Sequence, residues 1–101
     1  MFEAHALLEY PCESCAIIYN NKLHIVKNAA TDKRAAFLIP RRELLEAYKS
    51  PTGLQRIVHS HTMTSEKPSE QDLKGMAATN CPWSIYSTVT KSWYHSDEEE
   101  K

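Results

Sequence analysis

The chain has 101 residues, which is enough for one domain with one modest hydrophobic core. Hydrophobic residues make up 42% and charged residues 25%, a composition that is typical of folded globular proteins and excludes a wholly disordered chain. The formal net charge of -1 gives no electrostatic reason to expect nucleic acid as a partner, and two glycines are too few for a glycine-rich phosphate loop.

The N-terminal residues and the cysteines bear on where the protein works. The segment MFEAHALLEYP lacks the basic segment and the long apolar segment of a secretory signal, so we expect no secretion by that route. No apolar run approaches the roughly 18 residues that a membrane span needs, so we expect no span. Cys12, Cys15 and Cys81 cannot all pair within one chain, which favours reduced thiols in a cytoplasm.

The first third of the chain predicts a helix followed by a hairpin. Residues 2–10 carry apolar side chains near helical spacing, and the proline that follows ends this helix. The apolar runs 15–20 and 22–28 meet at Asn20 and Asn21, a pair that is typical of hairpin turns. We therefore expect two antiparallel strands here.

The middle of the chain predicts a third strand and a second helix. Residues 35–40, AAFLIP, form an apolar run that indicates a strand. Residues 41–50 place Leu44, Leu45 and Tyr48 on one face, which predicts a helix that packs through these side chains.

The second half of the chain continues this alternation. Residues 54–61 predict a strand that ends in two histidines, and residues 69–79 predict a helix with a favourable N-terminus. The runs 83–89 and 91–95 predict a final hairpin. The pattern indicates an α+β domain in which helices flank a mixed sheet.

The charge pattern sets the expected domain boundary. We expect a single domain over residues 1–95, because no linker or internal repeat divides the chain. Residues 96–101, SDEEEK, form an acidic run that we expect to be a disordered tail.

The strand that ends in histidines predicts a metal site. Residues two apart in a strand point to the same face, so His59 and His61 stand side by side and can share one zinc ion. Asp72, in the first turn of the following helix, can supply a carboxylate as the third ligand. Three protein ligands leave one position of a tetrahedral zinc open for water, which is typical of catalytic sites.

Ordinary structural roles can explain the same residues. Ser69 and Asp72 match the pattern of a helix-capping box, and such caps are common. His59 and His61 can also be partly exposed residues at a strand end. The two interpretations are compatible, because the first turn of a helix is a rigid place from which to present a ligand. Ser69 can in addition donate a hydrogen bond to an oxyanion.

The four residues in order resemble the motif of a known family. His59, His61, Ser69 and Asp72 match the H-x-H-x7-S-x2-D motif of the JAMM (MPN+) metallopeptidases. In that family a glutamate lies upstream, often within P-x-E-x-C, and Glu13 holds this position in PCESC. The resemblance implies an MPN (JAB/JAMM) fold with zinc on His59, His61 and Asp72. It also implies that Glu13 and Ser69 are catalytic, with Glu13 holding the zinc-bound water and moving its proton.

Further segments are similar to a narrower group. The HA and YPCESC segments near the start and the PW dipeptide after the third helix resemble the N-terminal domain of bacteriophage tail assembly proteins. This likeness implies a place in the host cytoplasm during assembly or in the virion tail. It also suggests phage tail proteins as partners, and an amide bond of a peptide or of peptidoglycan as substrate.

Other residue patterns give weaker alternatives. Cys12 and Cys15 form a C-x-x-C pair without a matching second pair, so we expect Cys15 to be buried at a strand start. Trp83 and the aromatic residues that follow it could stack on bases or sugars, but core packing or an oligomer contact is the simpler interpretation.

Two functions from different classes follow. The first is a zinc-dependent metallopeptidase or isopeptidase that hydrolyses an amide bond with a metal-activated water, in phage tail assembly or cell-wall penetration. The second is a zinc-binding structural or assembly protein of a phage tail tip that performs no chemistry. The joint presence of a base, three ligands and an oxyanion donor favours the enzyme.

Overall fold

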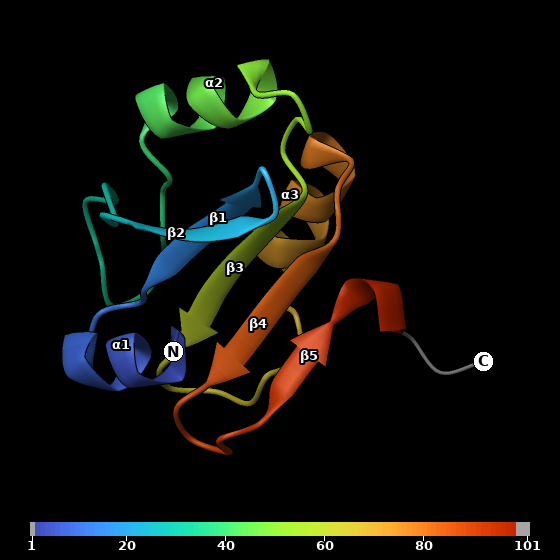
Figure 1. Cartoon of the computed structure of the whole chain (residues 1–101). Helices are drawn as coiled ribbons and strands as arrows, with labels where there is room; N and C mark the ends of the chain where they lie inside the picture. The colour runs from blue at the N-terminus through green and yellow to red at the C-terminus, as the bar shows by residue number, and fades with distance from the viewer. Residues whose placement is uncertain (1, 99–101) are drawn as a thin grey trace.

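The computed structural model describes residues 2–98, which form an α+β domain with one sheet (Figure 1). The elements in chain order are α1 (Phe2–Glu9), β1 (Cys15–Tyr19), β2 (Lys22–Val26), α2 (Arg41–Lys49), β3 (Arg56–His61), α3 (Glu70–Thr79), β4 (Trp83–Ser87), β5 (Trp93–His95) and the 3-10 helix η1 (Ser96–Glu98). None of the helices in this part of the chain has the length and apolar character needed to cross a membrane.

The sheet is mixed, as the sequence predicted. Its five strands lie in the order β2-β1-β3-β4-β5. Strand β1 is antiparallel to β2 and β3, β3 is parallel to β4, and β4 is antiparallel to β5. A parallel pair needs a crossover connection, and α3 supplies it between β3 and β4. The helix that follows the histidine strand is therefore held directly beside that strand.

The predicted hairpins are both present. Asn20 and Asn21 join β1 to β2 and have φ angles of 52° and 60°. Two successive residues with positive φ are the signature of a type I′ turn, which asparagine tolerates better than most residues. The second hairpin joins β4 to β5.

Alternation along the strands builds a core on each face of the sheet. Cys15 and Ile17 face α2 and α3, while Ala16 faces α1. The buried cluster on the α2 and α3 face comprises Cys15, Ile17, Val26, Ile39, Ala47, Ile57 and Trp83. The cluster on the α1 face comprises Phe2, Ala6, Ala16, Val58 and Tyr86. Because His59 follows Ile57 by two positions, it lies on the α3 face.

The strand predicted over 35–40 is wrong. This segment is irregular, and side-chain hydrogen bonds replace the ladder of a sheet. The Leu38 N–H donates to Oδ1 of Asn28, and Nδ2 of Asn28 donates to the Ala36 carbonyl oxygen. The segment therefore satisfies its backbone polar groups without a neighbouring strand.

Helix α2 forms where it was predicted, but it packs through a different face. Ala47 is fully buried, whereas the relative exposures of Leu45 and Tyr48 are 46% and 50%. Leu44 lies against the core cluster as expected. The small Ala47 side chain lets the helix backbone approach the sheet, which turns Leu45 and Tyr48 toward solvent.

The acidic run after residue 95 begins with ordered structure. Ser96–Glu98 form η1, and Asp97 pairs with Arg56 through nitrogen–oxygen contacts of 2.6 and 3.1 Å. The prediction of disorder is therefore wrong for residues 96–98, because a cation on β3 meets the first carboxylate of the run. Residues 99–101 lie outside the described residues.

Gly75 allows α3 to lie close to the sheet. A Cβ atom at this position would lie 2.5 and 2.7 Å from two ring carbons of Trp83. The Trp83 ring is buried, and its Nε1–H donates to Thr79 Oγ1 at 2.9 Å. The ring therefore cannot move aside without losing packing and a hydrogen bond.

We expect Gly75→Ala to lower the free energy of unfolding by about 1–2 kcal/mol. Alanine is the better helix former by about 1 kcal/mol, but contacts of 2.5 and 2.7 Å place the overpacking cost in the upper part of its range, at about 2–3 kcal/mol. Urea unfolding of the variant beside the exposed neighbour variant Lys74→Ala measures this. A Gly75→Ala protein as stable as the wild type would show that α3 shifts at little cost.

Candidate metal centre

The two histidines come from the central part of the sheet. His59 and His61 are 1% and 5% exposed and project from the same face of β3. Strand β3 pairs with β1 on one side, where His59 lies opposite Cys15, and with β4 on the other. Backbone hydrogen bonds on both sides hold this strand rigidly. The imidazoles are thus fixed in position before any ligand binds.

Asp72 reaches the histidines from the first turn of α3. Ser69 is the N-cap, and its Oγ accepts the Asp72 N–H at 3.1 Å. The Ser69 N–H donates to Asp72 Oδ2 at 2.9 Å, which completes a capping box. Both interpretations of this sequence segment hold together. The cap fixes Asp72, and the fixed carboxylate faces the histidines.

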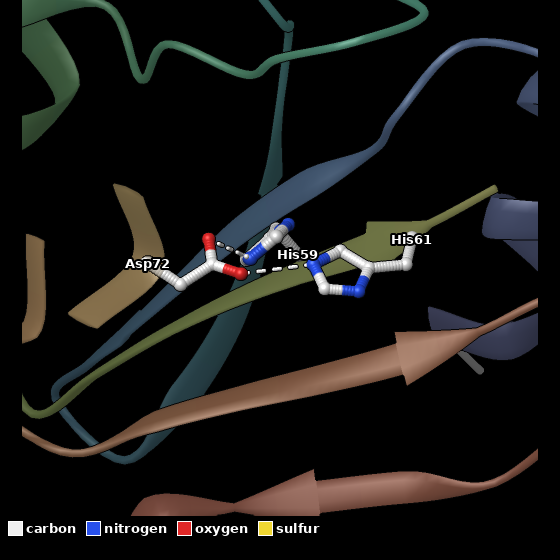
Figure 2. A group of neighbouring side chains, drawn as sticks. All are labelled: His59, His61 and Asp72. Carbon is white, nitrogen blue, oxygen red and sulfur yellow. Dashed lines mark hydrogen bonds and ion pairs between the residues drawn. The ribbon is translucent and has the colours of Figure 1, made fainter. Parts of the chain in front are cut away.

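Imidazole nitrogens and carboxylate oxygens converge at short distances. His59 Nε2 lies 2.9 Å from Asp72 Oδ1, and His61 Nε2 lies 2.9 Å from Asp72 Oδ2 (Figure 2). One ligand atom from each of the three residues lies within 4.8 Å of the others. Within residues 2–98 this is the one group of three or more such side chains that could hold a metal ion.

Hydrogen bonds around the cluster favour a cation at its centre. His61 Nδ1 lies 2.7 Å from the Ser65 carbonyl oxygen, a pure acceptor, so Nδ1 carries a proton and donates it. In a neutral imidazole Nε2 then presents a lone pair toward the Asp72 carboxylate. Lone pairs facing lone pairs are stable only with a proton or a metal ion between them. This fixing of the ring by a backbone carbonyl is typical of metal-binding histidines.

His59 supports the same conclusion. Its Nε2 is buried and, among the described residues, has no hydrogen bond of good geometry, although Asp72 Oδ1 is 2.9 Å away. A buried nitrogen without an aligned partner is costly in a folded protein. A metal ion held by His59, His61 and Asp72 would satisfy it, so the residues present fit such an ion.

The charges of the cluster are strongly coupled. Burial alone would lower the pKa of His59, but Asp72 and Glu13 outweigh it and raise that pKa. For His61, burial lowers the pKa, while its contacts with Asp72 and with the Ser65 backbone raise it. The pKa of His61 is raised overall. Burial would raise the pKa of Asp72, yet the two histidines hold it well below its ordinary value. Asp72 is therefore an ionised carboxylate, as a metal ligand must be.

Glu13 lies beside the cluster, 46 positions before His59 in the chain. Ser14 and Ser60 exchange hydrogen bonds that continue the pairing of β1 and β3 by one residue. This brings Glu13 to the histidine strand, with Oε1 3.6 Å from His59 Nδ1. The Glu13 side chain is 12% exposed. It is thus close to the cluster and on the side away from Asp72.

The cluster opens into a pocket of about 600 Å³. Glu13, His59, His61, Ser69 and Asp72 all line it, so the five residues singled out in the sequence share one cavity. A carboxylate, two imidazoles, a hydroxyl and a second carboxylate can together bind a metal and transfer protons at its surface.

Sequence reasoning missed the aromatic wall of this pocket. Phe37 stacks on His59 with ring centroids 4.2 Å apart and an interplanar angle of 18°. Trp83 contacts both rings edge-on, at 5.8 Å from His59 and 5.7 Å from Phe37. Trp83 is a core residue, as predicted. Residues 35–40, which include Phe37, were predicted to form a strand. The stack of Phe37 on His59 was therefore not predicted.

The buried cysteine of β1 has a structural role. Cys15 is fully buried at the start of β1, as predicted, and burial raises the pKa of its thiol to about 12. A thiol with such a pKa is unreactive at neutral pH. The thiol lies 3.8 Å from the Val26 carbonyl oxygen.

Comparison with known proteins agrees with this geometry. The chain matches the family described as prokaryotic homologs of the JAB domain, over residues 2–97. No curated protein matches the chain significantly. Since the match spans nearly the whole chain, the protein belongs to the prokaryotic JAB domain family, and its α+β fold agrees with that membership.

Proposed function

We propose that this protein is a zinc-dependent metallopeptidase or isopeptidase that hydrolyses an amide bond. The observation that carries the proposal is the convergence of His59, His61 and Asp72 in one pocket with Glu13 beside them. The JAB family match supports it, since that family includes peptidases.

Each residue has a role in this proposal. His59, His61 and Asp72 hold zinc, which when bound acts as a Lewis acid and lowers the pKa of a water to about 7. Glu13 accepts a proton from the attacking water at a carboxylate oxygen and delivers it to the departing amine nitrogen. Its position 3.6 Å from His59 Nδ1 keeps the carboxylate at the edge of the metal cluster.

Ser69 combines a structural role with a chemical one. Its Oγ accepts the Asp72 N–H, which leaves the hydroxyl hydrogen free to donate. Ser69 also lines the pocket. We therefore assign Ser69 to stabilise the oxyanion that forms when the amide carbonyl is attacked.

Cleavage that depends on zinc is the direct test. A panel of linear peptides, peptidoglycan-type cross-linked peptides and ubiquitin-like isopeptide conjugates is incubated with the protein, and products are followed by mass spectrometry. We expect the protein to cleave one class, to lose activity with a chelator, and to regain it with about one equivalent of zinc. Cleavage that persists in the chelator would contradict a metal-dependent mechanism.

The biological setting is part of the proposal. Resemblance of the first segments and of the PW dipeptide to phage tail assembly proteins supports a role in tail assembly or cell-wall penetration. The partners are then phage tail proteins, and the protein acts in the host cytoplasm or in the virion tail. The substrate in that setting is a tail protein precursor or a peptidoglycan cross-bridge.

The rival function is a metal-binding scaffold of the tail tip. Exposed Leu45 and Tyr48 on α2 favour it, because apolar side chains on an outer helix can contact a partner. Co-purification with tail components that survives His59→Ala and His61→Ala would support the scaffold. Loss of infectivity in a phage carrying those variants would support a role for the metal cluster.

A further inference from the structure

Asn28 is buried between the general base proposed above and the segment that follows β2. It is 8% exposed and lies two residues beyond the end of β2. Between β2 and α2 the chain has neither helix nor strand, yet it carries Phe37, which stacks on His59. Something other than a sheet must therefore hold this segment against the cluster.

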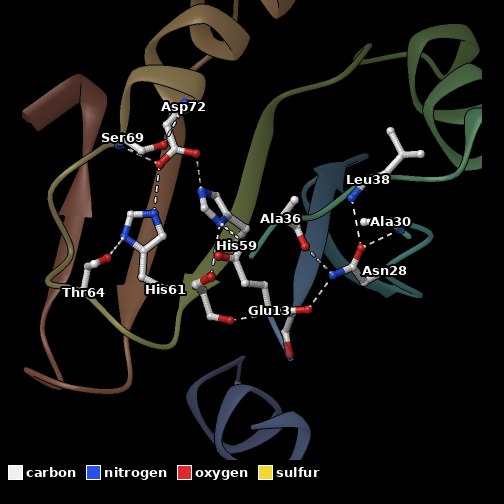
Figure 3. A network of polar contacts seen from close by, with 12 residues as sticks. Glu13, Asn28, Ala30, Ala36, Leu38, His59, His61, Thr64, Ser69 and Asp72 are labelled. Atoms are coloured by element: carbon white, nitrogen blue, oxygen red, sulfur yellow. Dashed lines mark hydrogen bonds and ion pairs between the residues drawn. The ribbon is translucent and has the colours of Figure 1, made fainter. Parts of the chain in front are cut away.

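The Asn28 side chain uses its whole hydrogen-bonding capacity. Its Nδ2 donates to the carbonyl oxygens of Glu13 and Ala36, at 2.9 and 3.0 Å. Its Oδ1 accepts the N–H groups of Ala30 and Leu38, also at 2.9 and 3.0 Å (Figure 3). An amide has two donor hydrogens and two acceptor lone pairs, and all four are satisfied.

These bonds join the two walls of the pocket. Glu13 is held on both sides of its backbone, because its N–H donates to the Lys33 carbonyl oxygen at 2.7 Å while Asn28 holds its carbonyl. Ala36 and Leu38 flank Phe37 and are bound by the same amide. One side chain therefore contributes both to the position of Glu13 and to the stack of Phe37 on His59, alongside the backbone bonds from Glu13 to Lys33 and from Ala29 to Leu38.

We propose that Asn28 is a positioning residue. It holds Glu13 and the Phe37 ring against the cluster of candidate metal ligands. The part that concerns Glu13 rests on the proposed function. The part that concerns Phe37 does not, because it is a statement about the protein alone. Within residues 2–98 the hydrogen bonds of the Asn28 side chain go to Glu13, Ala30, Ala36 and Leu38 and to none of the three candidate metal ligands, so Asn28 acts through its neighbours.

Asn28→Asp is the informative substitution. Aspartate keeps the shape of the side chain and the oxygen that accepts the Ala30 and Leu38 N–H groups. Asn28→Asp would replace two donors by an oxygen that faces the carbonyls of Glu13 and Ala36. The carboxylate oxygen of Asn28→Asp would then repel the two carbonyl oxygens that the asparagine Nδ2 attracts. The matched control is Asn21→Asp in the exposed β1–β2 turn, where Gln55 Nε2 donates to Oδ1 and the acceptor is kept.

The first measurement is independent of activity. A ring stacked on an imidazole shifts the proton resonances of that imidazole, and the difference between wild type and Phe37→Leu defines this shift for His59. In protein without added metal we expect Asn28→Asp to lose most of the shift and Asn21→Asp to keep it. Asn28→Asp protein that keeps the full shift would overturn the proposal.

The second measurement concerns Glu13. For a cleaved substrate, we expect Asn28→Asp to bind about one zinc per chain and to lose turnover on the order of 10²-fold, with little change in KM. If Asn28→Asp turns over substrate at the wild-type rate, the proposal that Asn28 positions Glu13 is overturned. If the wild type cleaves nothing, the proposed function fails, and the resonance shift still decides whether Asn28 holds Phe37.

A variant that does not fold calls for a milder one. Asn28→Ser carries no charge and removes the bridge between the walls without repulsion. We expect it to show the same loss of the ring shift with zinc content retained. A folded Asn28→Ser protein with an unchanged shift would contradict the proposal as firmly as the aspartate variant.

Discussion

We expect replacement of Glu13 by glutamine to leave about one zinc ion bound per chain and to lower the rate of amide cleavage by about 10²–10⁴-fold. The side chain keeps its size and its place at the edge of the cluster, with Oε1 beside His59 Nδ1. Glutamine cannot accept a proton at neutral pH, so only the proton transfer is lost. Zinc content is measured by mass spectrometry, and cleavage is measured on the substrate found in the panel.

The matched control for this variant is Glu9→Gln. Glu9 is the other acidic residue near the end of α1, and it is exposed. The chemical change is the same, and we expect the cleavage rate to stay at the wild-type value. A Glu13→Gln protein that cleaves at the wild-type rate would show that another group moves the proton. Loss of cleavage only in Glu9→Gln would identify that group.

Local sequence patterns predicted the parts of the fold that local chemistry determines. The turn at Asn20 and Asn21 follows from their tolerance of positive φ. The start of α3 follows from the reciprocal bonds of Ser69 and Asp72. The alternation of side chains along a strand places His59 and His61 on one face. Each of these inferences needs only a few neighbouring residues.

Long-range contacts explain what the sequence did not show. The apolar run over 35–40 has the composition of a strand, but its hydrogen bonds go to Asn28. The stack of Phe37 on His59 joins residues 22 positions apart, as their numbers show. Helix periodicity placed Leu44 correctly but not Leu45 and Tyr48, because the depth of packing depends on Ala47 meeting the sheet.

The resemblance of the motif located residues whose proximity no local pattern could show. Glu13 lies in the segment between α1 and β1, and the histidines lie at the end of β3. Only the antiparallel pairing of these strands brings them together. Strand alternation predicted a metal site of His59, His61 and Asp72, with a helix cap and two strand histidines as the alternative, and the resemblance added Glu13. The fold joins these parts into one pocket lined by all five residues.

We expect His59→Ala to remove stoichiometric zinc binding and the stability that bound zinc would confer. A ligand that binds only the folded state adds RT ln(1 + [L]/Kd) to the free energy of unfolding, which is about 2.7 kcal/mol at 100 times Kd. We expect zinc to raise the unfolding free energy of the wild type by about this amount at that concentration. We expect no such increase in His59→Ala, because two remaining ligands hold the ion poorly.

The comparison has to separate metal binding from packing. His59 is buried against Phe37 and Trp83, so His59→Ala also loses packing in the metal-free protein. The informative quantity is therefore the difference between zinc-loaded and metal-free protein for each variant. His24→Ala is the matched control, because His24 is a strand histidine that stacks on Tyr19 at 4.0 Å, outside the metal cluster. A wild type that gains no stability from zinc and holds none by mass spectrometry would leave only a capped helix beside two buried histidines. Zinc retained by His24→Ala and lost by His59→Ala would assign the ion to the pocket, since both variants remove one imidazole from the sheet.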